Sequence, residues 1–290
     1  MSFGLVLGGG GAVGIAWEIG VLAALEEAGA SVRGAAVVVG TSAGSIVGAQ
    51  VFGGRPFSDM LAEMQDTSEP AQMQQNTGAM PRANVSETFE VLAGVGDARE
   101  RGRKLGEFAL SRPDPFPEAM YLAMIGHLIK VQDWPTQTRF LPTGVDCKTG
   151  ERVAFERTQG VPFVAAVATS CCVPGLVPAV TINGRRYIDG GVDSPSNLDV
   201  VLGTGVDRVL FIGPFGGEHS PPLGRAVELL QSELAMAEKA GLRTLSVTPS
   251  PSFAAKVGVD FLNTSLRPAS VACGLEDGRN AVARVKQFLA

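Results

Sequence analysis

The first 53 residues alternate apolar runs with glycine-rich turns and helix-like stretches. Residues 3–7 and 35–39 are short and apolar, and helix-like stretches follow at about 15–28 and 43–51. A strand, a crossover helix and a second strand form a right-handed unit in which the two strands are parallel. The pattern therefore predicts an α/β fold built on a mainly parallel sheet.

The second apolar run ends in the letters G-T-S-A-G, residues 40–44. A serine between Gly40 and Gly44, on a sharp turn from strand to helix, is typical of a nucleophile that must project above a sheet. The same turn leaves backbone N–H groups and a helix N-terminus close to a developing negative charge. Ser42 is therefore the candidate nucleophile.

Four consecutive glycines, residues 8–11, follow the first apolar run, and Gly14 comes shortly after. Bare backbone N–H groups of this kind can approach an anionic group or an oxyanion closely. The letters G-x-G-x-x-G also satisfy the dinucleotide fingerprint, which expects an acidic residue roughly 20 positions on, at the end of the next strand. That strand ends in V-G-T-S without a carboxylate. We therefore favour an oxyanion hole beside Ser42 and keep a nucleotide-binding protein as an alternative.

A third motif, Asp189-Gly190-Gly191, follows a hairpin signal. Asn183-Gly184 stands between two strand-like runs, 179–182 and 185–188, and this dipeptide is typical of a type I′ turn. The second strand then ends at Asp189, and the paired glycines allow another segment or a substrate to pass close to its carboxylate. An aspartate in an ordinary surface turn would give the same letters.

Glycine-rich loop, G-x-S-x-G and D-G-G, in this order, resemble the patatin-like phospholipase family. The segment T-S-C-C-V-P-G-L-V-P at 169–178 is similar to one that the family has before its D-G-G hairpin. The similarity covers roughly residues 3–55 and 140–215. It implies a three-layer α/β/α fold and an acyl hydrolase without metal or cofactor. The implied substrate is a lipid or other acyl ester, reached through transient contact with a membrane or micelle.

The resemblance also implies roles for individual residues. Ser42 would be the nucleophile and Asp189 the base of a Ser–Asp dyad. The backbone amides of three glycines would form the oxyanion hole: Gly9, Gly10 and Gly11. Five further glycines would support the motifs: Gly14, Gly40, Gly44, Gly190 and Gly191. One departure is Val13, which stands where the family often has Lys or Arg.

The sequence holds two histidines, so a catalytic triad must be weighed against the dyad. His127 lies in an apolar helix-like stretch, where a packed or exposed histidine is usual. His219 lies in a Gly/Pro loop, and Ser42, Asp189 and His219 follow the chain order of an α/β-hydrolase triad. In those enzymes several strands precede the elbow, whereas here one does. We favour the dyad, and keep the triad esterase and a catalytically silent interaction protein as alternatives.

We expect one domain over residues 1–290, with 56–135 as a mostly helical cap or lid. That insertion begins with a polar stretch of weak periodicity and then has helix-like stretches near 85–92, 101–110 and 117–130. Elsewhere we expect strands at 139–146, 152–155, 209–212 and 244–247, helices at 162–170, 223–240 and 275–289, and a loop at 246–252.

Composition and charge limit the partners that the protein can bind. The formal net charge of −5 and the lack of a basic stripe exclude nucleic acid as a partner and argue against lasting attachment to anionic lipid. One local basic cluster is expected to be a solvated helix face, with a phosphate contact as the alternative: Arg99, Arg101, Arg103 and Lys104. The oligomeric state is left open.

The four cysteines match no zinc spacing, so we expect buried free thiols in a reducing compartment. No signal peptide is visible at the N-terminus. Residues 161–183 are uncharged, but their prolines and polar centre predict a buried core segment rather than a membrane span. We therefore expect a cytoplasmic protein.

Overall fold

A computed structural model describes residues 2–66, 97–216, 224–258 and 260–290 of the 290-residue chain. Within these residues, eight strands form one sheet with the order β5-β6-β3-β2-β1-β7-β8, and β4 pairs with β3. Neighbours from β3 through β2, β1 and β7 to β8 are parallel, whereas β4 and β6 lie antiparallel to β3, and β5 to β6. The bounds are β1 Phe3–Leu7, β2 Val37–Gly40, β3 Arg139–Asp146, β4 Arg152–Ala154, β5 Val180–Ile182, β6 Arg185–Asp189, β7 Arg208–Ile212 and β8 Arg243–Val247.

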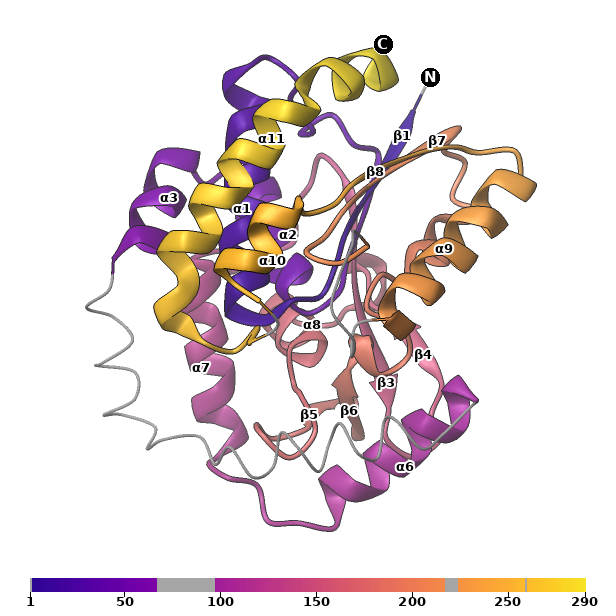
Figure 1. Cartoon of the computed structure of the whole chain (residues 1–290). Coiled ribbons are helices and arrows are strands. Elements are labelled where there is room, and N and C mark those ends of the chain that lie inside the picture. The colour runs from indigo at the N-terminus through magenta and orange to yellow at the C-terminus, as the bar shows by residue number, and fades with distance from the viewer. Residues whose placement is uncertain (1, 67–96, 217–223, 259) are drawn as a thin grey trace.

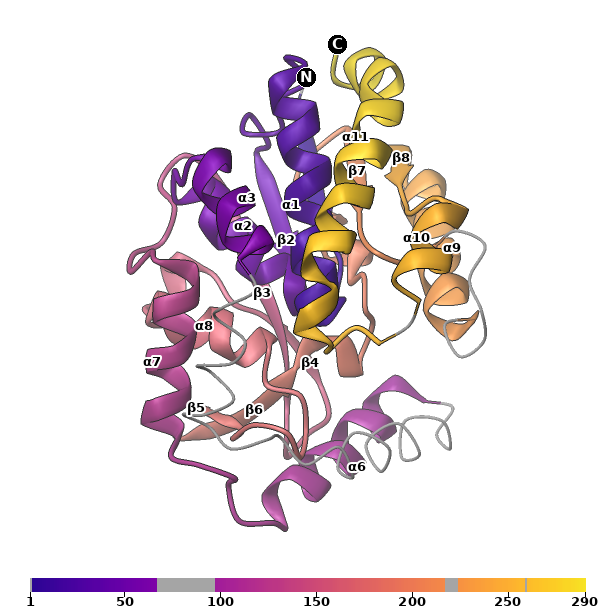
Figure 2. The same cartoon turned by 60° about the vertical axis from the view of Figure 1, so that its left-hand side comes forward.

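Side chains alternate across the sheet and fill two hydrophobic clusters. In β1, Leu5 and Leu7 belong to one cluster and Val6 belongs to the other. The first face is covered by α1, α2, α8 and α11, and the opposite face by α9 and the short helix η3 (Figures 1 and 2). Each face is therefore buried under helices. This arrangement confirms the three-layer α/β/α fold with a mainly parallel sheet.

Three helices begin earlier than the sequence predicts, among them α6, which starts at Ala98 rather than near residue 101. α1 starts at Gly11 rather than near residue 15, so the glycine-rich loop runs directly into the helix. α11 starts at Arg267 and packs along α1 over most of its length. The bounds are α1 Gly11–Glu27, α2 Ala43–Phe52, α3 Phe57–Gln65, α6 Ala98–Leu110, α7 Glu118–Ile129, α8 Phe163–Ser170, η3 Leu198–Val201, α9 Gly224–Lys239, α10 Pro251–Lys256 and α11 Arg267–Leu289.

A further short helix lies partly in the segment that we expected to be a loop, 246–252. α10 begins at Pro251, with Ser250 as its N-cap, and buries Phe253 against Trp17 of α1. The ring centroids of Phe253 and Trp17 are 6.3 Å apart in an edge-to-face arrangement. The expected loop is thus shorter than predicted, because a proline at the first helical position is compatible with a helix start.

The expected insertion, 56–135, contributes three described helices, α3, α6 and α7. The helix expected near 85–92 lies outside the described residues. α6 packs closely on the turn between β3 and β4, because Gly106 faces the backbone of Cys147 and Gly102 faces Gly150. Whether any part of 56–135 acts as a cap or lid stays a prediction.

The basic cluster on α6 is mostly a solvated, ion-paired face, as expected. Arg99 pairs with Glu151 at 2.9 Å, and Arg103 and Lys104 pair with glutamates one turn away on the same helix. Arg101 differs, because its side chain is buried and donates to the carbonyl oxygen of Asp193 at 3.0 Å. Among the helices that the structure describes, none has both the length and the apolar composition needed to cross a membrane.

Candidate active site

The parallel register brings the two glycine motifs to the same edge of the sheet. Leu7, the last residue of β1, pairs with Gly40, the last residue of β2. The glycine-rich loop and the G-x-S-x-G turn therefore leave the sheet side by side. Gly44 makes this approach possible: a Cβ there would lie 2.1 Å from the carbonyl oxygen of Leu7. Any side chain at this position would separate the two turns.

Ser42 lies on the strained turn that the sequence predicts. Its φ is 51° and its ψ is −115°, a conformation that non-glycine residues rarely adopt. Ser42 is the N-cap of α2, and its backbone N–H donates to Oγ of Ser170, 2.9 Å away, at the end of α8. The neighbouring Ser45 is fully buried, and its hydroxyl donates to the carbonyl oxygen of Ser42 at 2.8 Å. Of these two serines, only Ser42 is partly exposed.

The β5–β6 hairpin positions Asp189 near Ser42. β5 and β6 form the expected hairpin, and Asn183 and Gly184 have the positive φ values that a type I′ turn requires. Asp189 ends β6, and its carboxylate accepts a hydrogen bond from the N–H of Gly191 at 2.7 Å and interacts with the Ser42 side chain. The carboxylate is buried, with 4% of the residue exposed. Asp189 is therefore a buried carboxylate that interacts with the candidate nucleophile, and it does not lie in an ordinary surface turn.

Burial sets the proton affinity of Asp189. Removal from water disfavours the charged form and raises the pKa of Asp189 from 3.8 to about 7, while the hydrogen bonds from Gly191 and Ser42 act in the opposite direction. A carboxylate with a pKa near neutrality can accept and return a proton during a reaction at neutral pH. Asp193 and Asp199, the other aspartates of this region, contact the guanidinium of Arg152 at 3.2 and 2.6 Å.

The glycine-rich loop lies close to Ser42. A Cβ added at Gly9 would be 3.6 Å from Cβ of Ser42. The N–H of Gly9 donates to the carbonyl oxygen of Pro195 at 2.8 Å, and the next two amides, Gly10 and Gly11, stand at the N-terminus of α1. Gly11 has a φ of 56°, which suits glycine. Val13, in the first turn of α1, is fully buried, so this position carries an apolar core side chain.

Two polar residues that hydrogen-bond to this site could not be predicted from the sequence. Ser170 accepts the Ser42 amide, and Asn197 donates its side-chain amide to Oγ1 of Thr41 at 3.0 Å. Their partners lie 128 and 156 positions away in the chain, so no local pattern reveals either contact. For Ser170, the similarity of its segment to the family was the one available signal.

The remaining candidate residues are the two histidines and the four cysteines. His127 is exposed on α7, and His219 lies outside the described residues. Three cysteines are buried and free, as expected, whereas Cys171 is half-buried and donates to the carbonyl oxygen of Ser42 at 3.2 Å. Burial raises the pKa of the Cys171 thiol. Within the described part of the chain, no group of three or more potential metal-ligating side chains is present.

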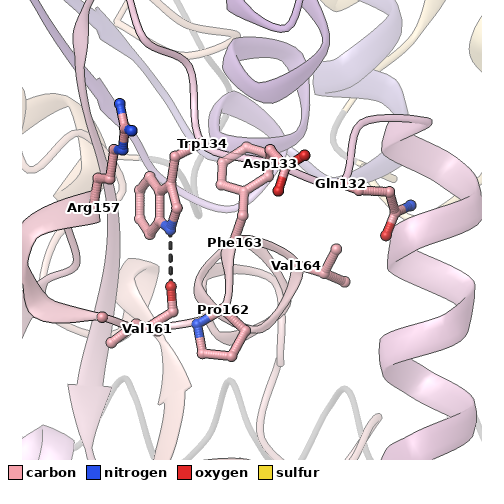
Figure 3. A pocket seen from close by; sticks show the side chains of 9 residues that line it. Gln132, Asp133, Trp134, Arg157, Val161, Pro162, Phe163 and Val164 are labelled. Atoms are coloured by element: carbon pink, nitrogen blue, oxygen red, sulfur yellow. Dashed lines mark hydrogen bonds between the residues drawn. The ribbon is translucent and has the colours of Figure 1, made fainter.

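A surface pocket of about 580 Å³ lies at the other end of α8 from Ser170 (Figure 3). Trp134 and Phe163 form its aromatic wall, with ring centroids 5.1 Å apart, and the indole N–H donates to the carbonyl oxygen of Val161 at 2.8 Å. Neither Ser42 nor Asp189 lines it. This pocket is therefore separate from the candidate active site.

Fold and site together define an α/β protein with a serine on a strained strand-to-helix turn beside a buried carboxylate. The family model of the patatin-like phospholipases matches residues 5–202, which is more than half of the chain. The chain belongs to this family, whose model is that of enzymes that hydrolyse lipid esters.

Similar proteins agree with this assignment. Uncharacterized NTE family proteins of Mycobacterium bovis and Mycobacterium tuberculosis are each 25% identical over 217 residues, which is 75% of this chain. The chain spans about half the length of these relatives, since the match covers 50% of each. The crystal structure of VipD from Legionella pneumophila is similar in fold, with a TM-score of 0.50 and 15% identity over 99% of this chain and 67% of that one.

Proposed function

We propose that this protein is a serine acyl hydrolase that cleaves lipid esters with a Ser42–Asp189 dyad. The observation that carries the proposal is that Ser42, on its strained turn, and the buried carboxylate of Asp189 interact with each other. Family membership supplies the substrate class, a lipid or lipid-like ester. A dyad needs no histidine, because Asp189 itself serves as the base for the Ser42 hydroxyl.

In the first half-reaction, Oγ of Ser42 attacks the ester carbonyl while Asp189 accepts the hydroxyl proton. The carbonyl electrons move to oxygen, and the backbone N–H groups of Gly10 and Gly11 stabilise that oxyanion together with the N-terminus of α1. Gly9 was also expected to donate, but its amide donates to Pro195. Collapse of the intermediate breaks the bond to the leaving alkoxide, which takes the proton from Asp189.

In the second half-reaction, water attacks the acyl group on Ser42, and Asp189 again accepts the proton. The tetrahedral intermediate then expels Oγ of Ser42, which regains its proton from Asp189, and the fatty acid leaves. The same base and the same oxyanion donors serve both steps. Ser170 contributes by holding the Ser42 amide, and thereby the turn, in place.

A fluorophosphonate probe followed by peptide mass mapping tests the nucleophile. We expect the adduct on Ser42 and none on Ser45, which is buried and hydrogen-bonded. Hydrolysis of a p-nitrophenyl ester should disappear in Ser42→Ala. An adduct on another serine, or ester hydrolysis that survives Ser42→Ala, would contradict the proposal.

The triad alternative is tested with the two histidines. Under the dyad, turnover of His219→Ala stays within a few-fold of the parent, like that of the matched control His127→Ala, whose side chain is exposed on α7. A catalytic histidine would instead cost about 10⁴-fold or more, because removing one member disables the unit. A collapse in His219→Ala alone would replace the dyad by a Ser–His–Asp triad.

A further inference from the structure

The side chain of Asn197 lies between the two turns that carry the proposed dyad. Asn197 is fully buried and has a left-handed backbone conformation, with φ 48° and ψ 35°. Its Nδ2 lies 3.0 Å from Oγ1 of Thr41 and 3.2 Å from the carbonyl oxygen of Gly190. Thr41 immediately precedes Ser42, and Gly190 immediately follows Asp189. One amide group therefore bonds to the neighbours of both dyad residues.

We propose that Asn197 is a positioning residue that fixes the separation of Ser42 and Asp189 by holding their two turns together. This inference rests on the proposed function and adds a residue that the dyad requires but that touches no reacting atom. Thr143 completes the link, because its hydroxyl lies 3.0 Å from that of Thr41 and 3.3 Å from Nδ2 of Asn197. All three side chains are fully buried.

A hydrogen bond to its side-chain oxygen fixes the orientation of the Asn197 amide. Arg152 donates to Oδ1 of Asn197 at 3.2 Å and binds both carboxylate oxygens of Asp199 at 2.6 and 2.7 Å. A guanidinium can only donate, so it selects the amide oxygen and turns the NH₂ group toward the dyad turns. The bidentate pair in turn holds the guanidinium in one geometry.

The residues beside Asn197 are also anchored. The carboxylate of Glu233 on α9 accepts from the hydroxyl of Ser196 at 2.6 Å and from the N–H of Leu198 at 2.8 Å. The residues on both sides of Asn197 are thus bound to a helix on the opposite face of the sheet from α2. The link therefore runs from α9 through Asn197 to the turn that carries Ser42.

Asparagine fits this position for two reasons. Its side chain offers donors and an acceptor without charge, whereas an aspartate could not donate to the carbonyl of Gly190. Asparagine also tolerates the left-handed conformation better than other residues apart from glycine. Removing the amide should let the turns of Ser42 and Asp189 move apart. A displacement near 1 Å costs about 10²-fold in rate, because proton transfer needs a short hydrogen bond.

The test is Asn197→Gly, which deletes the amide and keeps a residue that accepts positive φ. The matched control is Asn183→Gly, the same change at a φ of 50° in the exposed β5–β6 turn. Ser42→Ala is measured beside them, with circular dichroism and the melting temperature as checks on folding. We expect Asn197→Gly to lower kcat for a p-nitrophenyl ester about 10- to 100-fold with KM within about twofold. Asn183→Gly should match the parent.

The outcomes separate the two proposals. A folded Asn197→Gly with the parent's kcat, or with a raised KM alone, overturns the positioning role while Ser42→Ala remains inactive. Activity that survives Ser42→Ala instead overturns the proposed function, and the positioning role with it. If Asn197→Gly fails to fold, the positioning role is tested by comparing the turnover of Thr41→Val and Thr41→Ser. We expect the serine variant, which keeps the hydroxyl acceptor, to turn over at least tenfold faster, and equal rates overturn the inference.

Discussion

At the scale of single residues, the chemistry depends on how far burial changes an ordinary carboxyl group. An exposed aspartate has a pKa of about 3.9 and would be ionised throughout the neutral range. Asp189 is buried at the end of β6, and this burial raises its pKa to about 7. Burial therefore gives this carboxyl group a proton affinity that suits the general base of the proposed dyad at neutral pH.

The first prediction concerns pH. In the proposed dyad the ionised carboxylate of Asp189 is the base, so kcat/KM should fall about tenfold per pH unit below a pKa of about 7. The measurement is ester turnover from pH 5 to 9, in the parent and in His127→Ala and His219→Ala, with folding checked at each pH. The acid limb should persist in both histidine variants. A rate that stays flat down to pH 5 would contradict the assignment of Asp189 as a buried base.

The second prediction links Asp189 to stability. The folded pKa exceeds the unfolded one, so the contribution of this group is fully present below about pH 4 and is lost as pH rises toward 7. Asp189→Asn does not titrate and should therefore raise the free energy of unfolding at pH 8, by up to about 4 kcal/mol, with no gain near pH 4.

The same Asp189→Asn variant should lose about 10²–10⁴-fold in turnover, because an amide cannot accept the serine proton. Denaturant titrations at both pH values, with ester turnover measured on the same preparations, test the pair of effects. Loss of stability at pH 8 would mean that the Asp189 carboxylate stabilises the fold. Retained turnover would mean that another base serves Ser42.

Ser42 and Asp189 could be predicted from the sequence because each is marked locally. Ser42 follows an apolar run and lies between glycines, and Asp189 ends a hairpin marked by Asn183-Gly184. The pKa of Asp189 and the contacts of Asn197 could not be predicted. The pKa depends on burial by the whole fold, and the contacts of Asn197 depend on partners from distant parts of the chain, such as Thr41 and Thr143.

At the scale of elements, the sequence predicts strands and helices better than their ends. The β5–β6 hairpin and α8 appear where expected, and α2 extends the expected 43–51 by one residue. α1 instead begins four residues early, because glycine at position 11 can adopt a positive φ at the start of a helix. α11 begins eight residues early, where Pro268 occupies the first turn and Arg267 is buried.

The third prediction tests how closely α1 and α11 pack. A Cβ at Gly274 of α11 would lie 2.2 Å from the carbonyl oxygen of Trp17 on α1, and backbone cannot easily move aside. Gly274→Ala should therefore lower the free energy of unfolding by about 1–3 kcal/mol, despite alanine's better helix propensity. The control is Gly126→Ala on α7, where the nearest atoms would be 3.7 Å away.

Gly126→Ala should leave stability unchanged or raise it by up to about 1 kcal/mol, because only helix propensity changes. Thermal and denaturant unfolding of both variants against the parent provide the measurement. Equal stabilities for Gly274→Ala and the parent would show that the two helices can separate without cost. Such a result would also mean that close packing does not require glycine at two further positions of this contact, Gly20 and Gly278. Each of these glycines faces backbone of the partner helix.

At the scale of the whole molecule, net charge decides how the protein meets a lipid surface. The formal net charge is −5, and the exposed cations of α6 are paired with glutamates. An anionic membrane attracts a protein by about 1 kcal/mol for each unpaired Lys or Arg near its surface. The net charge and these ion pairs argue against lasting attraction of this kind, so we expect apolar contact and the ester itself to provide most of the binding to a lipid substrate.

The fourth prediction follows from this charge balance. Ser42→Ala, which leaves the lipids intact, should bind neutral vesicles at least as well as vesicles with added anionic lipid, and added salt should not release it. Vesicle flotation at low and high salt measures both. The matched variant E100Q/E107Q frees Lys104 and Arg103 from contacts of 3.1 and 2.7 Å. It should bind anionic vesicles more strongly and lose that gain in salt. If Ser42→Ala itself prefers anionic vesicles in a salt-sensitive way, a cationic surface outside these ion pairs must face the membrane.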